Sequence, residues 1–178
     1  ETATATLTVK KIAMQSLVLS PTSVVGANTT AANQITLTEM PAQDISLSAT
    51  SSKTAAVVPS NVVIPAGSTF TQFPIQTSIV AATVTAGITV SSGNSTKSAN
   101  LQVTPLVPQT LTVPSPVVGG GNVSATLTMN ASVGGAPAVV DVTSSDASVS
   151  VTGNAVTVDA GTASKVFTIS TVSVSSPV

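Results

Sequence analysis

The sequence VVIPAGSTFTQFPI, at residues 62–75, decides the fold because a related stretch, VTVDAGTASKVFTI, returns at residues 156–169. The two copies are 94 positions apart throughout, as the pair Gly67 and Gly161 shows. A constant period of this size indicates one structural unit used twice. In each copy, β-branched residues alternate before an Ala-Gly turn, and Phe and Ile stand two positions apart after it. This pattern predicts two strands joined by a tight turn.

Length and composition favour two modular β units. The chain has 178 residues, which suits two units of about 90 residues each. With 42% hydrophobic residues it has enough apolar surface to fold, yet no run of eighteen apolar residues predicts a membrane span. We predict a strand at residues 1–11 that belongs to another repeat or subunit, a first β-sandwich at 12–105 and a second at 106–178.

The first repeat reads as a series of short strands separated by clusters of Pro, Gly, Asn and Ser. Such a series is typical of a two-sheet sandwich of immunoglobulin type. The large side chains that we expect in the two cores are Phe73, Ile75, Leu101, Val103, Phe167 and Ile169. The predicted strands are 17–20, 34–38, 45–50, 62–64, 70–76, 83–91 and 98–103.

The second repeat is shorter than the first. Val178 corresponds to Val84, since 178 − 94 = 84, so the equivalents of residues 85–103 are missing. The missing part carries four core-type side chains, which are worth about 6–12 kcal/mol together. A whole domain is stable by only about 5–15 kcal/mol. We therefore expect the second sandwich to need strands from elsewhere.

The N-terminal residues form a spare strand. Ala3, Ala5, Leu7 and Val9 alternate with threonines, which predicts a strand with one buried face. Its closest match in the chain is the last predicted strand of the first repeat, at residues 98–103, again 94 positions away. We expect these four apolar residues to form the strand-exchange interface with another repeat or subunit.

The residue types leave little room for catalysis. The chain has no His, Cys, Trp or Tyr, so it lacks the usual base at neutral pH, a thiol nucleophile and the best metal ligands. Asp141 and Asp146 could pair as carboxylates, but no aromatic platform for a sugar accompanies them. A net charge of −1 offers no basic patch for nucleic acid. We expect no enzyme, no metal and no cofactor.

Four Asn-X-Ser/Thr sequons make glycosylation a candidate modification, although a chain this rich in Ser and Thr would contain about as many by chance. All four fall in predicted turns or strand edges. The candidate acceptors are Asn28, Asn94, Asn122 and Asn130.

The runs LVLSPTSVVG at 17–26, ITLT at 35–38, IPAGS at 64–68 and ANLQV at 99–103 resemble the Ig-like tandem repeats of prokaryotic cell-surface proteins. The resemblance covers nearly the whole chain. It implies tandem Ig-like β-sandwiches at an extracellular or cell-surface location, and it brings no catalytic residue. The second copy departs from the pattern where Asp159 replaces Pro65.

Together these features predict a structural module of an extracellular filament, pilus or surface stalk. Its partners would be copies of itself or adjacent repeats of the same chain, joined by strand pairing. Two arrangements stay open: separate subunits that exchange the N-terminal strand, and a segment of a longer continuous repeat chain. The alternative function is an adhesin or carbohydrate-binding module, which the lack of Trp and Tyr disfavours.

Overall fold

A computed structural model describes residues 3–8, 11–93 and 95–175 of the chain. The chain divides into two compact units. The second unit takes residues 25–28, 78–82 and the chain from residue 104 onward, and the first takes the remainder. Within the described residues the regular structure is β-strand, apart from one 3₁₀ turn, η1, at Thr152–Asn154. The expectation of an all-β chain is confirmed.

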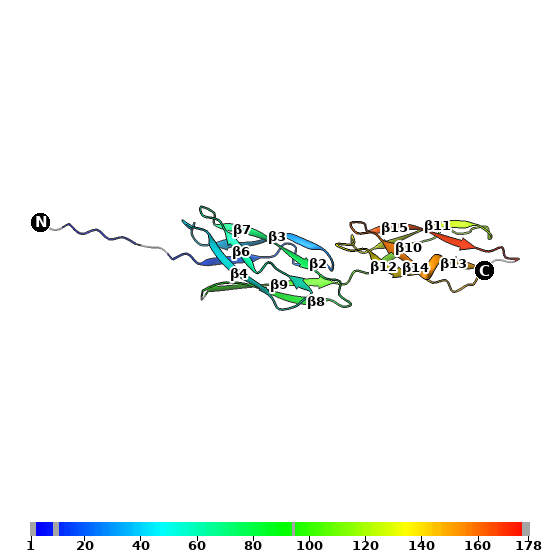
Figure 1. Ribbon diagram of the computed structural model, residues 1–178, viewed down its shortest axis with the longest axis horizontal. Helices are drawn as coiled ribbons and strands as arrows, with labels where there is room; N and C mark the ends of the chain where they lie inside the picture. Colours follow the sequence, from blue (N-terminus) through cyan, green and yellow to red (C-terminus); the bar gives the residue numbers. More distant parts are fainter. Residues whose placement is uncertain (1–2, 9–10, 94, 176–178) are drawn as a thin grey trace. The chain divides into compact units, whose positions relative to one another are not determined.

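The first unit contains two sheets in a sandwich-like arrangement (Figure 1). One sheet has the strand order β1 (Met14–Val18), β3 (Thr29–Leu37), β7 (Phe70–Thr77) and β5 (Ala56–Val57). The other has the order β2 (Ser23–Val25), β9 (Ser95–Thr104), β8 (Val84–Ser92), β4 (Ile45–Ser51) and β6 (Asn61–Ile64).

Each strand that the sequence predicts in the first repeat overlaps a strand of the structure. The sequence pattern misses β2 and β5, which have only three and two residues. Strands this short show no alternation, because a period of two needs at least four residues to be recognised. Both lie at the edge of a sheet and are held by a single neighbour.

Alternating side chains of both sheets fill the core of the first unit. On β7, Phe73 and Ile75 are buried while the residues between and beside them are exposed. On β9, Leu101 and Val103 are fully buried. Strict alternation of this kind is what a strand with one core-facing side requires.

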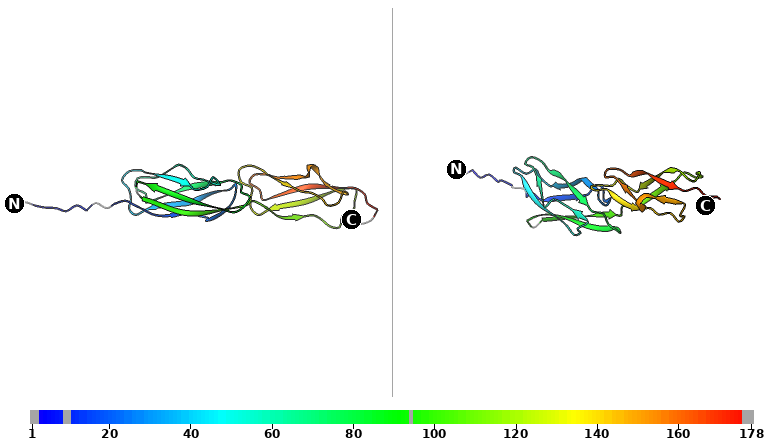
Figure 2. Two further views of the ribbon diagram at one scale, coloured as in Figure 1. Left: turned by 90° about the horizontal axis from the view of Figure 1, so that it is seen from below. Right: turned by 45° about the vertical axis from the view of Figure 1, so that its right-hand side comes forward.

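The second unit has one full sheet and one short sheet, seen from two further sides in Figure 2. The full sheet has the order β10 (Pro108–Thr112), β11 (Asn122–Met129), β15 (Ser164–Thr171) and β13 (Val149–Val151). The short sheet pairs β12 (Ala138–Asp141) with β14 (Ala155–Val158).

Strand registers show which elements of the two units correspond. Met14 pairs with Leu37 in the first unit as Pro108 pairs with Met129 in the second, and a register shift follows both pairs. The pairing of β4 with β6 likewise matches that of β12 with β14. In the described part of the second unit, β2, β8 and β9 have no counterpart. The two units therefore have the same strand arrangement, except that the described part of the second unit lacks the three strands on one side of its short sheet.

Candidate assembly interface

The N-terminal segment, residues 3–8, lies in extended backbone outside any strand (Figure 1, blue). All six side chains are exposed, and Leu7 is 87% exposed. Ala3, Ala5 and Leu7 therefore form an apolar row that packs against nothing in the described chain. Val9, the fourth residue of the predicted interface, lies outside the described residues.

Strand β9 is the counterpart of the N-terminal segment in the first unit, and it shows which of the equivalent side chains are buried there. Leu7 corresponds to Leu101 at the 94-residue offset, and Leu101 is fully buried in the first core. The neighbouring positions, Asn100 and Gln102, are exposed, as threonines at the equivalent N-terminal positions would be. The alternation of the N-terminal segment thus fits the two-faced environment that β9 occupies.

The short sheet of the second unit has an open edge. In the first unit, β4 pairs with β6 on one side and with β8 on the other. Its counterpart β12 pairs with β14 alone among the described residues. Strand β4 continues to Ser51 along its contact with β8, whereas β12 ends at Asp141. We attribute the shorter length of β12 to the lack of a second neighbouring strand, because no hydrogen bonds from such a strand hold the residues after Asp141 in extended backbone.

The open side also exposes β10. All five residues of β10 are exposed, whereas its counterpart β1 includes the buried Met14. Leu111 is 50% exposed although its counterpart Leu17 is half-buried. The units differ chiefly in β2, β8 and β9, so we attribute this exposure to the lack of those strands.

Residues 117–118 correspond to β2 but form no strand. Strand β2 pairs only with β9, so a unit without β9 offers it no ladder. Val118 is accordingly 90% exposed, and Val117 is 44% exposed. Exposed apolar groups and an unpaired strand edge on one unit are the features of a strand-accepting site.

The entry into the first strand is the same in both units. The backbone nitrogen of Ala13 donates to Thr38 Oγ1 over 3.1 Å, and Thr38 N donates back to Ala13 O over 2.9 Å. In the second unit, Val107 N donates to Asn130 Oδ1 and Asn130 N to Val107 O, each over 3.0 Å. The second unit is therefore built like the first up to the open edge.

The candidate glycosylation sites differ in their surroundings. Asn130 Nδ2 donates to Pro105 O over 3.0 Å, so this amide helps to hold the chain ahead of β10. Asn28 Nδ2 donates to Val25 O over 3.1 Å. Asn122 is exposed and accepts from Ser170 Oγ over 3.0 Å. Asn94 lies outside the described residues.

Three of the acidic residues have local structural partners. Asp44 accepts from Ala66 N over 2.8 Å, and Asp159 forms an exposed ion pair with Lys165 at 2.6 Å. Asp146 accepts from the hydroxyl and the backbone nitrogen of Ser148, which hold its pKa below the ordinary value. Among the described residues, no three His, Cys, Asp or Glu side chains gather where they could hold a metal.

The expected core residues fall into two groups. Phe73, Ile75, Leu101 and Val103 are at most 3% exposed in the first unit. In the second unit Ile169 is 6% exposed, but Phe167 is only half-buried. The residues that sequence reasoning missed are Leu111, Val113, Val117 and Val118. The 94-residue offset could have found them, since it already showed which strands their counterparts contact.

Comparison of the sequence with models of protein families finds no match, and comparison with curated protein sequences finds none either. Within the part of the chain that the structure describes, no helix has the length and apolar character needed to cross a membrane.

Proposed function

We propose that this chain is a structural, non-catalytic module of an extracellular filament, pilus or surface stalk, built from tandem Ig-like sandwiches. Repeats or subunits join head to tail through β-strand pairing. One observation carries the proposal: an exposed strand-like segment at residues 3–8 and the open edge of β12 occur in the same chain. The resemblance to Ig-like repeats of cell-surface proteins supports the extracellular location.

Strand addition matches the chemistry of both partners. The incoming segment supplies backbone donors and acceptors to an edge that has no strand opposite it in the described part of the chain, which gives affinity independent of side chains. Its alternate residues Ala5 and Leu7 then face the core, and the threonines face water. Covering Leu7, Leu111 and Val113 contributes roughly 1.5–3 kcal/mol for each side chain.

Surface charge does not oppose association between copies. The chain carries a net charge of −1, and only 6% of its residues are charged. Like-charge repulsion between identical chains is therefore small. A module that meets copies of itself has no need of the high net charge that keeps other proteins apart.

Two arrangements place the strand at the open edge. In separate subunits, the N-terminal segment of one copy resembles β9 in sequence but pairs with β12 of the next copy in the place that β8 holds beside β4. In a continuous repeat chain, further residues take this place and the N-terminal segment completes a preceding repeat. The mass of the fully denatured chain from its native material separates the two: about 17 kDa indicates subunits, and a mass several-fold larger indicates one continuous chain.

The test of strand pairing is a matched pair of variants in the 178-residue chain. We expect Leu7→Asp to abolish assembly, because it places a charge on the face that becomes buried. Thr6→Asp, on the opposite face of the same segment, should leave assembly largely intact. Sedimentation velocity and negative-stain electron microscopy report the assemblies. If both variants assemble like the unmodified chain, or if the unmodified chain stays monomeric, the proposal is wrong.

A further inference from the structure

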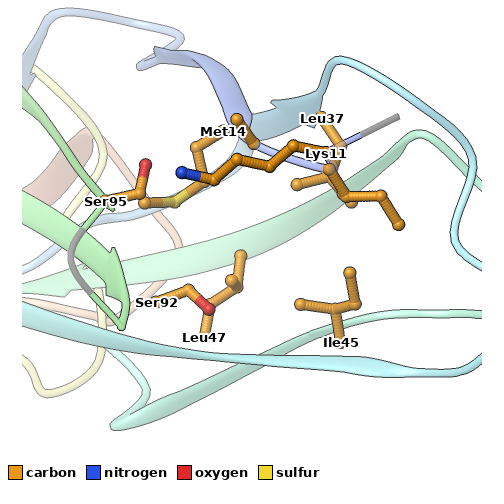
Figure 3. A pocket seen from close by; sticks show the side chains of 9 residues that line it. Lys11, Met14, Leu37, Ile45, Leu47, Ser92 and Ser95 are labelled. Carbon is orange, nitrogen blue, oxygen red and sulfur yellow. The ribbon is translucent and has the colours of Figure 1, made fainter. Parts of the chain in front are cut away.

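The end of the first unit next to the N-terminal segment contains a cavity of about 290 Å³. Its walls include Met14, Leu37 and Leu47, which are core residues exposed by 5%, 3% and 1%. Figure 3 shows Lys11, Met14 and Leu37 on one side of the opening and Ile45, Leu47 and Ser92 on the other. Ile12 also lines the cavity and is 37% exposed. The cavity thus leads from a rim that carries Lys11, Ser92 and Ser95 beside Ile12 into the apolar core.

The second unit has a cavity of about 300 Å³ in the corresponding place. Its walls include Pro108 and Met129, which pair with each other as Met14 and Leu37 do. They also include Ala138 and Val140, whose register on β14 matches that of Ile45 and Leu47 on β6. Leu106 takes the place of Ile12, since 12 + 94 = 106. The two cavities are the same feature of the repeat.

One wall of the second cavity has no counterpart in the first. Ile79 lines the second cavity and belongs to residues 78–82, a segment that is part of the second unit. Nothing equivalent to Ile79 is among the described residues that line the first cavity. The first unit therefore has the cavity, but no described residue lines it in the place that Ile79 takes in the second unit.

Residues 172–174 are the structural equivalent of residues 78–80. A Cβ on Gly26 would lie 2.5 Å from the carbonyl oxygen of Ser78, and a Cβ on Gly119 would lie 2.6 Å from that of Val172. Because Gly26 approaches Ser78 as Gly119 approaches Val172, Ser78 and Val172 occupy equivalent positions. Ser173 stands at the position of Ile79, and the valines on either side of it are accessible, since Val172 is 58% exposed and Val174 is 42% exposed.

We propose that Val172 and Val174 of a second copy of this chain seat on the cavity bounded by Ile12, Met14, Ile45 and Leu47. The inference rests on the proposed strand exchange and adds a second contact to the same junction. Ile12 follows Thr8 by four positions, a reach of at most about 14 Å. Strand exchange through residues 3–8 therefore brings the cavity close to the second unit of the neighbouring copy.

Cysteine cross-linking tests this contact, because the chain contains no cysteine of its own. One double variant combines Ile12→Cys with Val174→Cys, and another combines Ile12→Cys with Val172→Cys. The matched control combines Ile12→Cys with Val166→Cys, since Val166 is an exposed valine of β15 that lies neither on β12 nor in the segment after β15. After mild oxidation of assembled protein, we expect a ladder of covalent multimers on non-reducing denaturing gels from at least one of the first two variants. The control should give at least tenfold less multimer.

The outcomes separate this inference from the proposed function. Assembly with no ladder above the control would overturn the contact and leave strand exchange standing. A ladder that disappears when Leu7→Asp is added would support both. A chain that never assembles would remove the proposed function and this contact with it.

A single-site variant gives a second measure. Ile12→Asp alters a residue at the rim, so the first unit should keep its melting temperature. We expect the concentration needed for assembly to rise at least tenfold, because the apolar segment would meet a charge. An unchanged assembly concentration would contradict the proposal.

Discussion

Leu19 and Val113 occupy equivalent positions, one residue beyond β1 and β10, yet Leu19 is 4% exposed and Val113 is 43% exposed. Both follow strands with the same register on their neighbours. The difference lies in what covers them, since the second unit lacks counterparts of β2, β8 and β9 in the described chain. The proposed strand exchange would therefore lower the exposure of Val113.

This relationship predicts unequal costs of truncation. We expect Leu19→Ala to lower the free energy of unfolding of the first unit by about 2–5 kcal/mol, because it leaves a cavity in a closed core. Val113→Ala should cost the unassembled chain less than about 1 kcal/mol. Denaturant titration of both variants measures the difference, and equal costs would contradict the open core.

The two equivalent phenylalanines should also differ. Phe73 is 3% exposed, and we expect Phe73→Ala to cost about 3–5 kcal/mol. Phe167→Ala should cost clearly less, since its ring is only half-buried. Differential scanning calorimetry can follow both units in the same chain. A melting temperature unchanged by Phe73→Ala would show that this ring is not part of the core.

A buried polar network supports the irregular pairing of β3 with β7. Asn33 is 0% exposed, donates to Thr30 Oγ1 over 2.7 Å and to Phe73 O over 3.1 Å, and accepts from Ser20 N over 3.3 Å. We expect Asn33→Ala to cost about 2–3 kcal/mol, because buried groups lose their partners. Asn100→Ala, at an exposed position on β9, is the control and should be nearly neutral in urea unfolding.

The three consecutive glycines at 119–121 should respond differently to alanine. A Cβ on Gly119 would lie 2.6 Å from Val172 O, whereas one on Gly121 would meet nothing within 4 Å. We expect Gly119→Ala to cost about 1–3 kcal/mol through crowding against backbone. Gly121→Ala should change stability by no more than about 1 kcal/mol, in either direction. Thermal unfolding of the two variants provides the comparison, and similar losses would contradict the close approach.

We expect the stability of the turn before β13 to depend on pH through Asp146. Ser148 donates through its hydroxyl over 2.6 Å and through its backbone nitrogen over 2.7 Å to Asp146 Oδ1, and both bonds lower the pKa of Asp146. Because the pKa is lower in the folded state, this contribution to stability is present above the unfolded pKa. It is lost as the pH falls through the folded pKa.

We expect Ser148→Ala to raise the pKa of Asp146, since the hydroxyl bond is the larger cause of the shift. Carboxyl ¹³C NMR titration measures the change. Ser145→Ala, at an exposed neighbour, should leave the titration of Asp146 unaltered. A pKa that does not move in Ser148→Ala would contradict the role of the hydroxyl.

Sequence reasoning located most of the strands because alternation is a local property. The paired stretches around Gly67 and Gly161 fold as the strand pattern predicted, with β6 leading to β7 and β14 to β15. The short strands β2 and β5 escaped it, since each exists only through its pairing with one neighbour. Sequence reasoning also missed the burial of Asn33, because a polar residue in an alternating strand pattern is expected to face solvent.

The sequence by itself determined that the chain is all-β, that the stretch around Gly67 returns 94 positions later around Gly161, and that residues 3–8 copy the pattern of a core strand. These follow from periodicity and offset, which need no knowledge of contacts in space. Only the tertiary structure decided that β12 has no partner on one edge among the residues it describes, that β10 is exposed, and that matching cavities lie at one end of each unit. Those features depend on which strands meet, and burial is a property of the neighbours that a residue finds rather than of the residue itself.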